Sequence, residues 1–224
     1  MPFFELCADS LDAALAAGRG GADRIELCVE LGIGGVTPPL AMIEAAVRAL
    51  AIPVHVLIRP RGGDFVYSGE EMVLLREQIE QSRRAGAAGV VAGVLLADGG
   101  VDTVRSRELV ELARPLRFVF HRAFDETSTP LKETLEAVIS TGADGLLTSG
   151  RAPNCIEGAE TIGRLVRQAA GRIEILAGAG LKLENVAQVA ARTGAPWLHG
   201  SLKRADGIDL ENDIRVAVQA LSAR

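Results

Sequence analysis

Residues 21–28 read GADRIELC, a Gly-Ala pair followed by a short stretch that alternates polar and apolar side chains. The same pair precedes three more strand-like stretches, at 86–87, 142–143 and 194–195. Glycine readily ends a helix because it adopts the left-handed backbone conformation. Each pair therefore indicates the junction between a helix and the strand that follows. The pairs fall at every second junction, a period that suits a closed ring of eight units.

Strand-like and helical segments alternate along the whole sequence. The helical segments carry start signals: Ser68 with Glu71 fits a capping box, and Thr129 followed by Pro130 fits an N-cap and a first helical residue. Eight strand–helix units in 224 residues predict an α/β fold, a (β/α)8 barrel of the TIM type. The strand candidates are 3–8, 24–28, 53–59, 89–95, 116–122, 144–149, 173–179 and 196–201.

A doubly wound open sheet is the structural alternative to the barrel. Such sheets usually have fewer strands, and no G-x-G-x-x-G turn of a dinucleotide-binding fold follows the first strand candidate. No linker, charge block or low-complexity segment divides the chain. We therefore expect residues 1–224 to form a single barrel domain.

The overall composition is that of an ordinary globular protein, with 48% hydrophobic and 24% charged residues. The net charge of −5 argues against binding to a nucleic-acid backbone, which usually needs a basic surplus. The sequence has no apolar run long enough to predict a membrane span, and its start does not resemble a signal peptide. Three cysteines do not indicate a disulfide framework. These features predict a cytoplasmic protein that binds neither nucleic acid nor membranes.

Side chains alternate between the two faces of a strand, so the apolar residues that face the helices identify those that face the barrel axis. This alternation turns all three histidines, His55, His121 and His199, toward the interior, together with charged residues from the first two strands. Barrel interiors normally hold branched aliphatic side chains, and buried charges must be paired or serve a site. The inward charged residues, Glu5, Arg24 and Glu26, therefore form either a self-neutralised ion-pair network or part of a functional cavity.

Cys7 and Cys28 lie at the ends of the first two strand candidates, and both face the interior. Adjacent strands are about 4.8 Å apart. Two thiolates at such a separation can hold a soft metal ion such as Cu(I), with His55 or His121 as a third ligand. Two small buried cysteines without a ligand are the simpler interpretation of the same pattern.

Polar residues gather where the predicted strands end, the face on which barrel enzymes place their chemistry. Glu26, His55 and His121 are the candidate acid–base groups there. Arg59 ends the third strand candidate, Asp125 follows the fifth, and the two complete the set of candidate catalytic residues.

Several residues near the same strand ends could bind an anion. Glycine-bearing turns follow the seventh and eighth strands, AGAGLK at 177–182 and HGSLK at 199–203, and many barrels bind phosphate at this pair of loops. Lys182 and Lys203 could assist, although plain turn chemistry explains these glycines equally well. The candidate anion-binding residues are Arg61, Arg122, Gly178, Gly180 and Ser201.

Several longer motifs extend from residue 3 to about residue 203: ELCADS (5–10), GADRIELC (21–28), GGVTPP (34–39), IPVHVLIRPRGGDFVYS (52–68), FHRAFDE (120–126), LLTSG (146–150) and AGAG (177–180). Together they resemble the CutC family, whose proteins are named for copper homeostasis. The resemblance implies a TIM-type barrel, a cytoplasmic location and a homodimer or higher oligomer. It also implies Cu(I) binding by paired cysteines that match Cys7 and Cys28.

Two functions follow from these observations. The first is copper homeostasis in the cytoplasm, with Cu(I) bound by Cys7 and Cys28. The second is an enzyme of unassigned reaction, an isomerase, lyase or hydrolase, that acts at the strand ends on a small anionic metabolite such as a sugar phosphate or a carboxylate. A two-thiol copper site has no need of the arginines in RPRGGDF (59–65), which favours a role for the mouth beyond copper.

Overall fold

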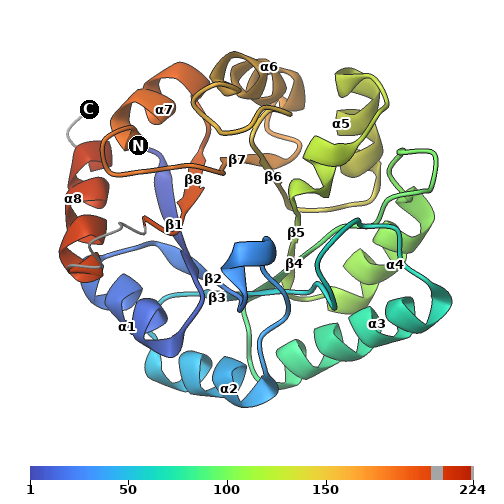
Figure 1. Ribbon diagram of the computed structural model, residues 1–224, viewed down its shortest axis with the longest axis horizontal. Coiled ribbons are helices and arrows are strands. Elements are labelled where there is room, and N and C mark those ends of the chain that lie inside the picture. The colour runs from blue at the N-terminus through green and yellow to red at the C-terminus, as the bar shows by residue number, and fades with distance from the viewer. Residues whose placement is uncertain (203–208, 223–224) are drawn as a thin grey trace.

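The computed structural model describes residues 1–202 and 209–222. Within these ranges, eight parallel strands close into a barrel in chain order and helices surround it (Figure 1). The predicted (β/α)8 barrel is therefore confirmed. The strands are β1 (Phe3–Ala8), β2 (Arg24–Leu27), β3 (Val54–Leu57), β4 (Gly89–Ala92), β5 (Arg117–Phe120), β6 (Gly145–Thr148), β7 (Glu174–Ala177) and β8 (Trp197–Gly200). The helices are α1 (Leu11–Gly20), α2 (Leu40–Ala49), α3 (Gly69–Arg84), α4 (Thr103–Ala113), α5 (Leu131–Ser140), α6 (Ala159–Ala169), α7 (Val186–Thr193) and α8 (Leu210–Ser222), with short 3-10 helices η1 (Leu31–Ile33) and η2 (Arg122–Glu126).

Most helix ends lie where the glycines and capping residues of the sequence predict them. Each of the four Gly-Ala glycines has a positive φ, from 63° to 87°. The capping box of α3 is present, with Ser68 and Glu71 bonded reciprocally. The expected start of α5 is wrong by one residue, because Pro130 takes the N-cap position with an extended ψ of 140°. The Thr129 hydroxyl contacts the Thr134 hydroxyl instead, at 2.7 Å.

The buried apolar residues form two clusters, one between the strands and the helices and one inside the barrel. The larger cluster lies between strands and helices and contains Phe4, Leu6, Ile25 and Phe118. A smaller cluster fills part of the barrel axis, so the predicted alternation of inward and outward residues is correct. The smaller cluster consists of Cys7, Cys28, Leu57, Val91, Val119, Leu147 and Leu176.

Each inward histidine occupies space left by a glycine on the neighbouring strand or its extension. A Cβ added to any of these glycines would lie between 2.5 and 3.1 Å from an imidazole atom. The pairs are His55 with Gly89, His121 with Gly93 and His199 with Gly178. Imidazole rings thus fit inside a barrel of this size because the facing positions carry no side chain.

Each helix within residues 1–202 and 209–222 is too short or too polar to cross a membrane.

Candidate functional site

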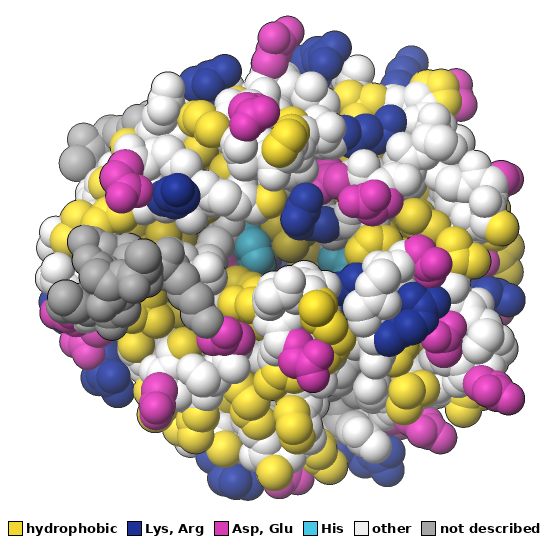
Figure 2. Space-filling model, in the orientation of Figure 1, with side chains coloured by type: hydrophobic (Ala, Val, Ile, Leu, Met, Phe, Trp, Pro, Cys, Tyr) yellow, Lys and Arg dark blue, Asp and Glu magenta, His cyan; other side chains and the backbone are white. Residues whose placement is uncertain are grey.

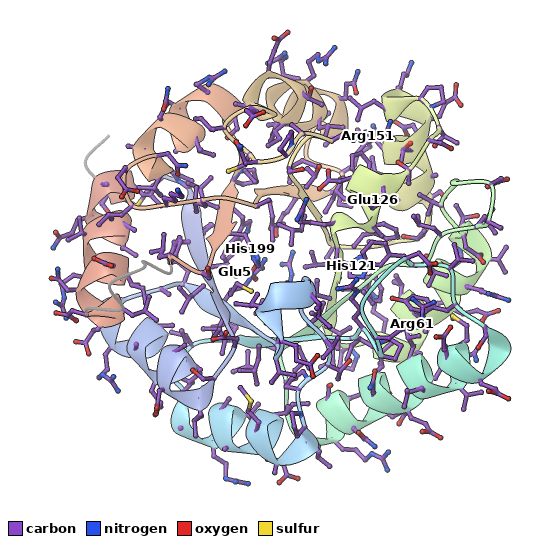
Figure 3. All side chains as sticks on the ribbon, viewed as in Figure 1. Glu5, Arg61, His121, Glu126, Arg151 and His199 are labelled. Atoms are coloured by element: carbon purple, nitrogen blue, oxygen red, sulfur yellow. The ribbon has the colours of Figure 1, made fainter. Side chains whose placement is uncertain are left out.

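The C-terminal ends of the strands open into a cavity of about 1020 Å³. The space-filling view shows two histidine side chains through the hollow near the centre of this face (Figure 2). Figure 3 identifies them by position as His199, toward β8, and His121, toward β5. Loops after most of the strands contribute to the wall, so the cavity is built as barrel active sites are.

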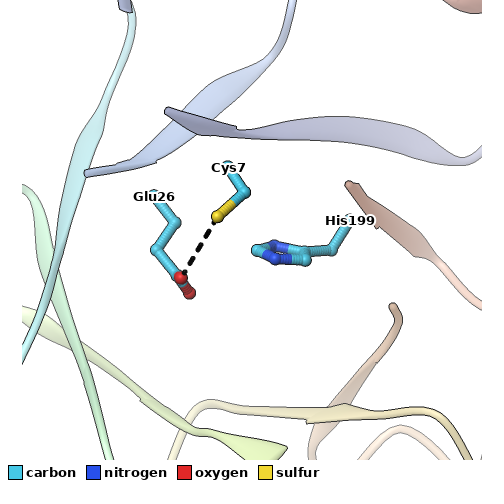
Figure 4. Close-up of side chains that lie close together, drawn as sticks. All are labelled: Cys7, Glu26 and His199. Carbon is cyan, nitrogen blue, oxygen red and sulfur yellow. Dashed lines mark hydrogen bonds between the residues drawn. The ribbon is translucent and has the colours of Figure 1, made fainter. Parts of the chain in front are cut away.

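Cys7, Glu26 and His199 meet at the floor of this cavity (Figure 4). One potential ligand atom from each residue lies within 4.8 Å of the others. The Cys7 thiol faces the Glu26 carboxylate, with Sγ 3.8 Å from Oε1. The Cys28 thiol completes the group, because its Sγ lies 3.8 Å from that of Cys7.

An ion-pair network lies directly below this cluster. Arg24 forms a buried salt bridge with Glu5, and its guanidinium stacks 3.7 Å above the Trp197 ring. The Nδ1 atom of His199 lies 2.7 Å from the second oxygen of Glu5. Since the Glu5 carboxylate accepts this bond, Nδ1 carries the proton, and the other ring nitrogen of His199 is left for the cavity.

The two interpretations of the inward charges therefore apply to different residues. Glu5 and Arg24 neutralise each other, as the network interpretation expects. Glu26 takes no part in an ion pair among the described residues, and its Oε2 atom is buried without a hydrogen-bond partner there. An unpartnered buried carboxylate oxygen is costly, and it is typical of a position that receives a ligand.

The charges of the cluster shift its pKa values in opposite directions. Burial alone would raise the pKa of Glu5, but the Arg24 charge and the His199 hydrogen bond outweigh it and hold that pKa well below the usual range. Burial would likewise lower the pKa of His199, but the Glu26 charge and the bond to Glu5 raise it. Burial raises the pKa of Glu26 to about 7. The hydrogen bond with Cys28, burial and the Glu26 charge together raise the pKa of the Cys7 thiol well above its usual value.

The side chains that lie beside Cys7 differ from the third metal ligand that the sequence suggested. The sequence suggested His55 or His121, whereas among the described residues the groups beside Cys7 are Glu26 and His199. The reason is closure of the barrel, which pairs β1 with β8 and places Glu5 opposite His199. A closed ring makes the first and last strands neighbours, but the register that sets Glu5 opposite His199 is not a local feature of the sequence.

His121 stands across the cavity from the cluster (Figure 3), with its ring centroid 4.7 Å from that of Phe65. Its Nδ1 accepts a hydrogen bond from the Ala123 amide at 3.3 Å, which leaves Nε2 as the protonated nitrogen. Burial and then the Arg59 charge lower the pKa of His121 to about 3, so the ring is neutral at pH 7. In this state His121 is a hydrogen-bond donor rather than a base, and its Nε2 has no partner among the described residues.

His55, the remaining acid–base candidate, lies lower in the barrel, where β3 pairs with Glu26 of β2. Burial lowers the pKa of His55 to about 4, with the Arg24 charge adding to the effect. His55 does not line the cavity, whereas Glu26 does.

The two arginines of the loop after β3 have different surroundings. Arg59 is buried and donates hydrogen bonds to the carbonyl oxygens of Ile33, Gly35 and Gly63. Arg61 lies beside α3, away from the centre of the barrel (Figure 3), and forms salt bridges with Asp64 and Glu71. Arg59 lines the cavity and Arg61 does not.

Asp125 and Arg122, from η2, are joined by a hydrogen bond of 3.1 Å between Arg122 Nε and Asp125 Oδ2. The Asp125 carboxylate also accepts bonds from the Thr148 hydroxyl, the Ser149 amide and hydroxyl, and the Arg151 amide. Both oxygens of Asp125 are thus engaged in holding η2 to the end of β6. Arg122 is half-exposed and lines the cavity.

The turns after β7 and β8 are only partly open to a ligand. The Gly178 amide donates to the Thr148 carbonyl at 3.0 Å, and the Lys182 amide donates to Asn185 Oδ1 at 2.8 Å. Gly180 and Ser201 line the cavity, whereas Gly178 makes room for His199. Lys203 lies outside the described residues.

Sequence reasoning placed His199 inside the barrel but did not assign it to the metal site. The missed signal was the joint occurrence of an inward histidine on β8 and an inward carboxylate on β1, which a closed barrel brings together. It also assigned no structural role to GGVTPP (34–39), between β2 and α2, where two successive glycines, Gly34 and Gly35, have positive φ angles.

Comparisons with known proteins agree on one family. The model of the CutC family matches residues 3–204. A protein named family protein CutC from Chromobacterium violaceum is 45% identical over 199 residues, covering 89% of this chain and 80% of its own. One from Vibrio cholerae is 44% identical over 201 residues, covering 89% and 79%. A Streptococcus agalactiae crystal structure, described as a copper homeostasis protein CutC, has 32% identity and a TM-score of 0.84 over 91% of this chain and 100% of its own. This chain therefore belongs to the CutC family.

Proposed function

We propose that the protein binds Cu(I) at the floor of the barrel and serves copper homeostasis in the cytoplasm. Cys7 and Cys28 are the principal ligands, and His199 is the third. The observation that carries the proposal is the distance of 3.8 Å between the two sulfur atoms, with a histidine and a carboxylate beside them. The name of the related S. agalactiae structure supports the same function.

The donor set suits a soft metal ion. Two sulfurs that each lie about 2.3 Å from one ion, at a near-tetrahedral angle, are about 3.8 Å apart. Thiolate and imidazole ligands favour Cu(I) over hard cations such as Mg²⁺. The bond from His199 Nδ1 to Glu5 is the outer-shell contact that commonly orients a metal-binding imidazole.

A Cu(I) titration of the reduced protein against a chromogenic chelator tests the proposal. We expect about one Cu(I) per chain, and we expect the double variant Cys7→Ser/Cys28→Ser to lose that binding. Cys155→Ser is the matched control, because Cys155 is the third free buried cysteine and lies outside the cluster. Unchanged copper stoichiometry in the double variant would contradict the proposal.

A second candidate function is supported by the cavity itself. Its volume of about 1020 Å³ is far larger than an ion needs and falls at the upper end of small-molecule sites. Arg122 and Lys182 contribute positive charge to its wall, and His121 contributes a donor that has no partner within residues 1–202 and 209–222. We propose as the alternative an enzyme that acts there on a small anionic metabolite. A thermal-shift screen of carboxylates and sugar phosphates tests it, because a ligand of the native state raises the melting temperature; a screen without any stabilising anion would count against it.

Two further predictions concern organisation of the chain. The family resemblance supports a homodimer or higher oligomer, which sedimentation velocity would test. A single barrel domain over residues 1–224 predicts one cooperative unfolding transition, and two separate transitions would contradict it.

A further inference from the structure

We propose that Arg59 positions residues 29–36 as a cover over Cys28. In this proposal, a metal ion or thiol reagent reaches Cys28 only when the cover opens, whereas Cys7 is reached directly from the cavity. The inference rests on the proposed copper site, because Cys28 is one of its ligands. We refer to residues 29–36 as the covering segment.

The covering segment is a small closed loop between β2 and α2. Val29 and Val36 form an antiparallel bridge at its base, with mutual N–O distances of 3.1 and 2.9 Å. Its tip is η1, which lies over the centre of the barrel mouth in Figure 1. Leu31 packs on the inner apolar cluster, whereas Ile33 is 52% exposed. The segment therefore has an inner face on the barrel and an outer face toward solvent.

Gly35 brings the covering segment next to Cys28. Gly35 has a φ of 84°, and a Cβ added there would lie in ordinary contact with Cys28 Sγ, at 3.6 Å, but would clash with the Leu57 side chain at 2.8 Å. A residue without a side chain therefore lets the segment pack on Leu57 beside the thiol. Cys28 is completely buried and does not line the cavity, whereas Cys7 is 7% exposed and does. Only one of the two sulfurs therefore faces the cavity.

Arg59 fixes the position of this segment. Its Nη1 donates to the carbonyl oxygens of Ile33 and Gly35 at 3.0 and 2.9 Å, and its Nη2 donates to Gly63 at 2.7 Å. One planar guanidinium thus ties the tip of the covering segment to the loop after β3. The side chain is 5% exposed, and its guanidinium donates to three main-chain carbonyl oxygens. A buried cation used in this way holds loops in place rather than neutralising a carboxylate.

Native-state alkylation of the metal-free, reduced protein with N-ethylmaleimide tests the inference, with the rate at each cysteine measured by mass spectrometry. We expect Arg59→Met to raise the rate at Cys28 at least tenfold and to leave the rate at Cys155 unchanged. Cys155 is also fully buried but is not covered by residues 29–36, so it reports general loosening of the fold. Comparing each cysteine with itself across variants removes differences in intrinsic reactivity. Arg61→Met is the matched control, since the Arg61 guanidinium bonds to Glu71, Asp64 and Val66 instead of the covering segment, and it should change neither rate.

The inference would be overturned by an unchanged Cys28 rate in Arg59→Met, or by equal acceleration at Cys28 and Cys155. If Arg59→Met does not fold, Arg59→Lys provides the same comparison, because lysine keeps the charge but lacks the fork that reaches two loops. Hydrogen exchange of the wild type adds a second readout: the Val36 amide should exchange at least tenfold faster than the Ile25 amide in β2, and equal protection would also overturn the inference. No copper is present in these assays, so this inference can fail while the copper site stands.

Discussion

The two histidines at the bottom of the cavity have the same burial and opposite electrostatics. His199 lies against the carboxylates of Glu5 and Glu26, and its pKa is raised despite burial. His121 lies on the other wall, where burial and the Arg59 charge lower its pKa to about 3. Burial lowers the pKa of both imidazoles, so the comparison shows that neighbouring charges account for the difference between them. One wall is suited to hold a cation, and the other presents a neutral donor.

The largest effect is expected on the free energy of unfolding, from removing the Glu5 carboxylate that binds both Arg24 and His199. Glu5→Gln leaves the buried Arg24 guanidinium without its partner, and breaking a buried ion pair typically costs about 3–5 kcal/mol. Urea unfolding of the metal-free variant measures this loss. Glu136→Gln is the control, because it removes an exposed partner of Arg172 and should cost much less. Equal losses of unfolding free energy in the two variants would show that the buried ion pair of Glu5 and Arg24 contributes no more than an exposed one.

A smaller effect, in pH dependence, is expected on the His121 side. In the unfolded chain this histidine binds a proton below about pH 6.5, whereas in the fold its pKa is about 3. The unfolded state therefore holds more protons between these values, and stability falls as the pH drops through this window. Between pH 7.5 and 5.0 the loss from this residue is about 2 kcal/mol. The variant His121→Asn keeps an acceptor for the Ala123 amide. Its free energy of unfolding in urea should fall less than that of the wild type between the two pH values, by the amount that His121 contributes. Identical losses of stability in wild type and variant would contradict the lowered pKa assigned to His121.

The smallest effect concerns the proton carried by Cys7. The hydrogen bond with Cys28, burial and the Glu26 charge raise its pKa, so the thiol is protonated near neutral pH and Cu(I) binding displaces a proton. The Cu(I) affinity should therefore increase about tenfold, or about 1.4 kcal/mol, between pH 6.5 and 7.5 for the proton that Cys7 releases, measured by chelator competition. A Cu(I) affinity that does not change with pH would contradict ligation by a buried thiol.

The sequence was sufficient for the barrel and for the direction of its strand residues, because both depend on local patterns. Gly-Ala junctions, capping signals and alternation placed Cys7, Cys28 and the three histidines on the inner face, and the inner apolar cluster agrees. The role of each inward charge could not be predicted, because it depends on neighbours across the ring. The pairing of β8 with β1 brings His199 to Glu5, and no local pattern records that contact.

The loops were harder to interpret than the strands. RPRGGDF (59–65) suggested anion binding from composition alone, but Arg61 is held by Glu71 and Asp64, and Arg59 by three carbonyl groups. Asp125 looked like a catalytic carboxylate, whereas its oxygens accept hydrogen bonds from the end of β6. Side-chain partners of this kind are set by tertiary packing, so residue type and spacing do not reveal them.

Copper K-edge X-ray absorption of the Cu(I)-loaded, reduced protein is the most direct test of the central claim that paired thiols and His199 form one copper site. We predict two sulfur ligands and one imidazole nitrogen, with one sulfur lost in Cys28→Ser and the nitrogen lost in His199→Ala. A spectrum without sulfur ligands, or one that neither substitution alters, would contradict the claim.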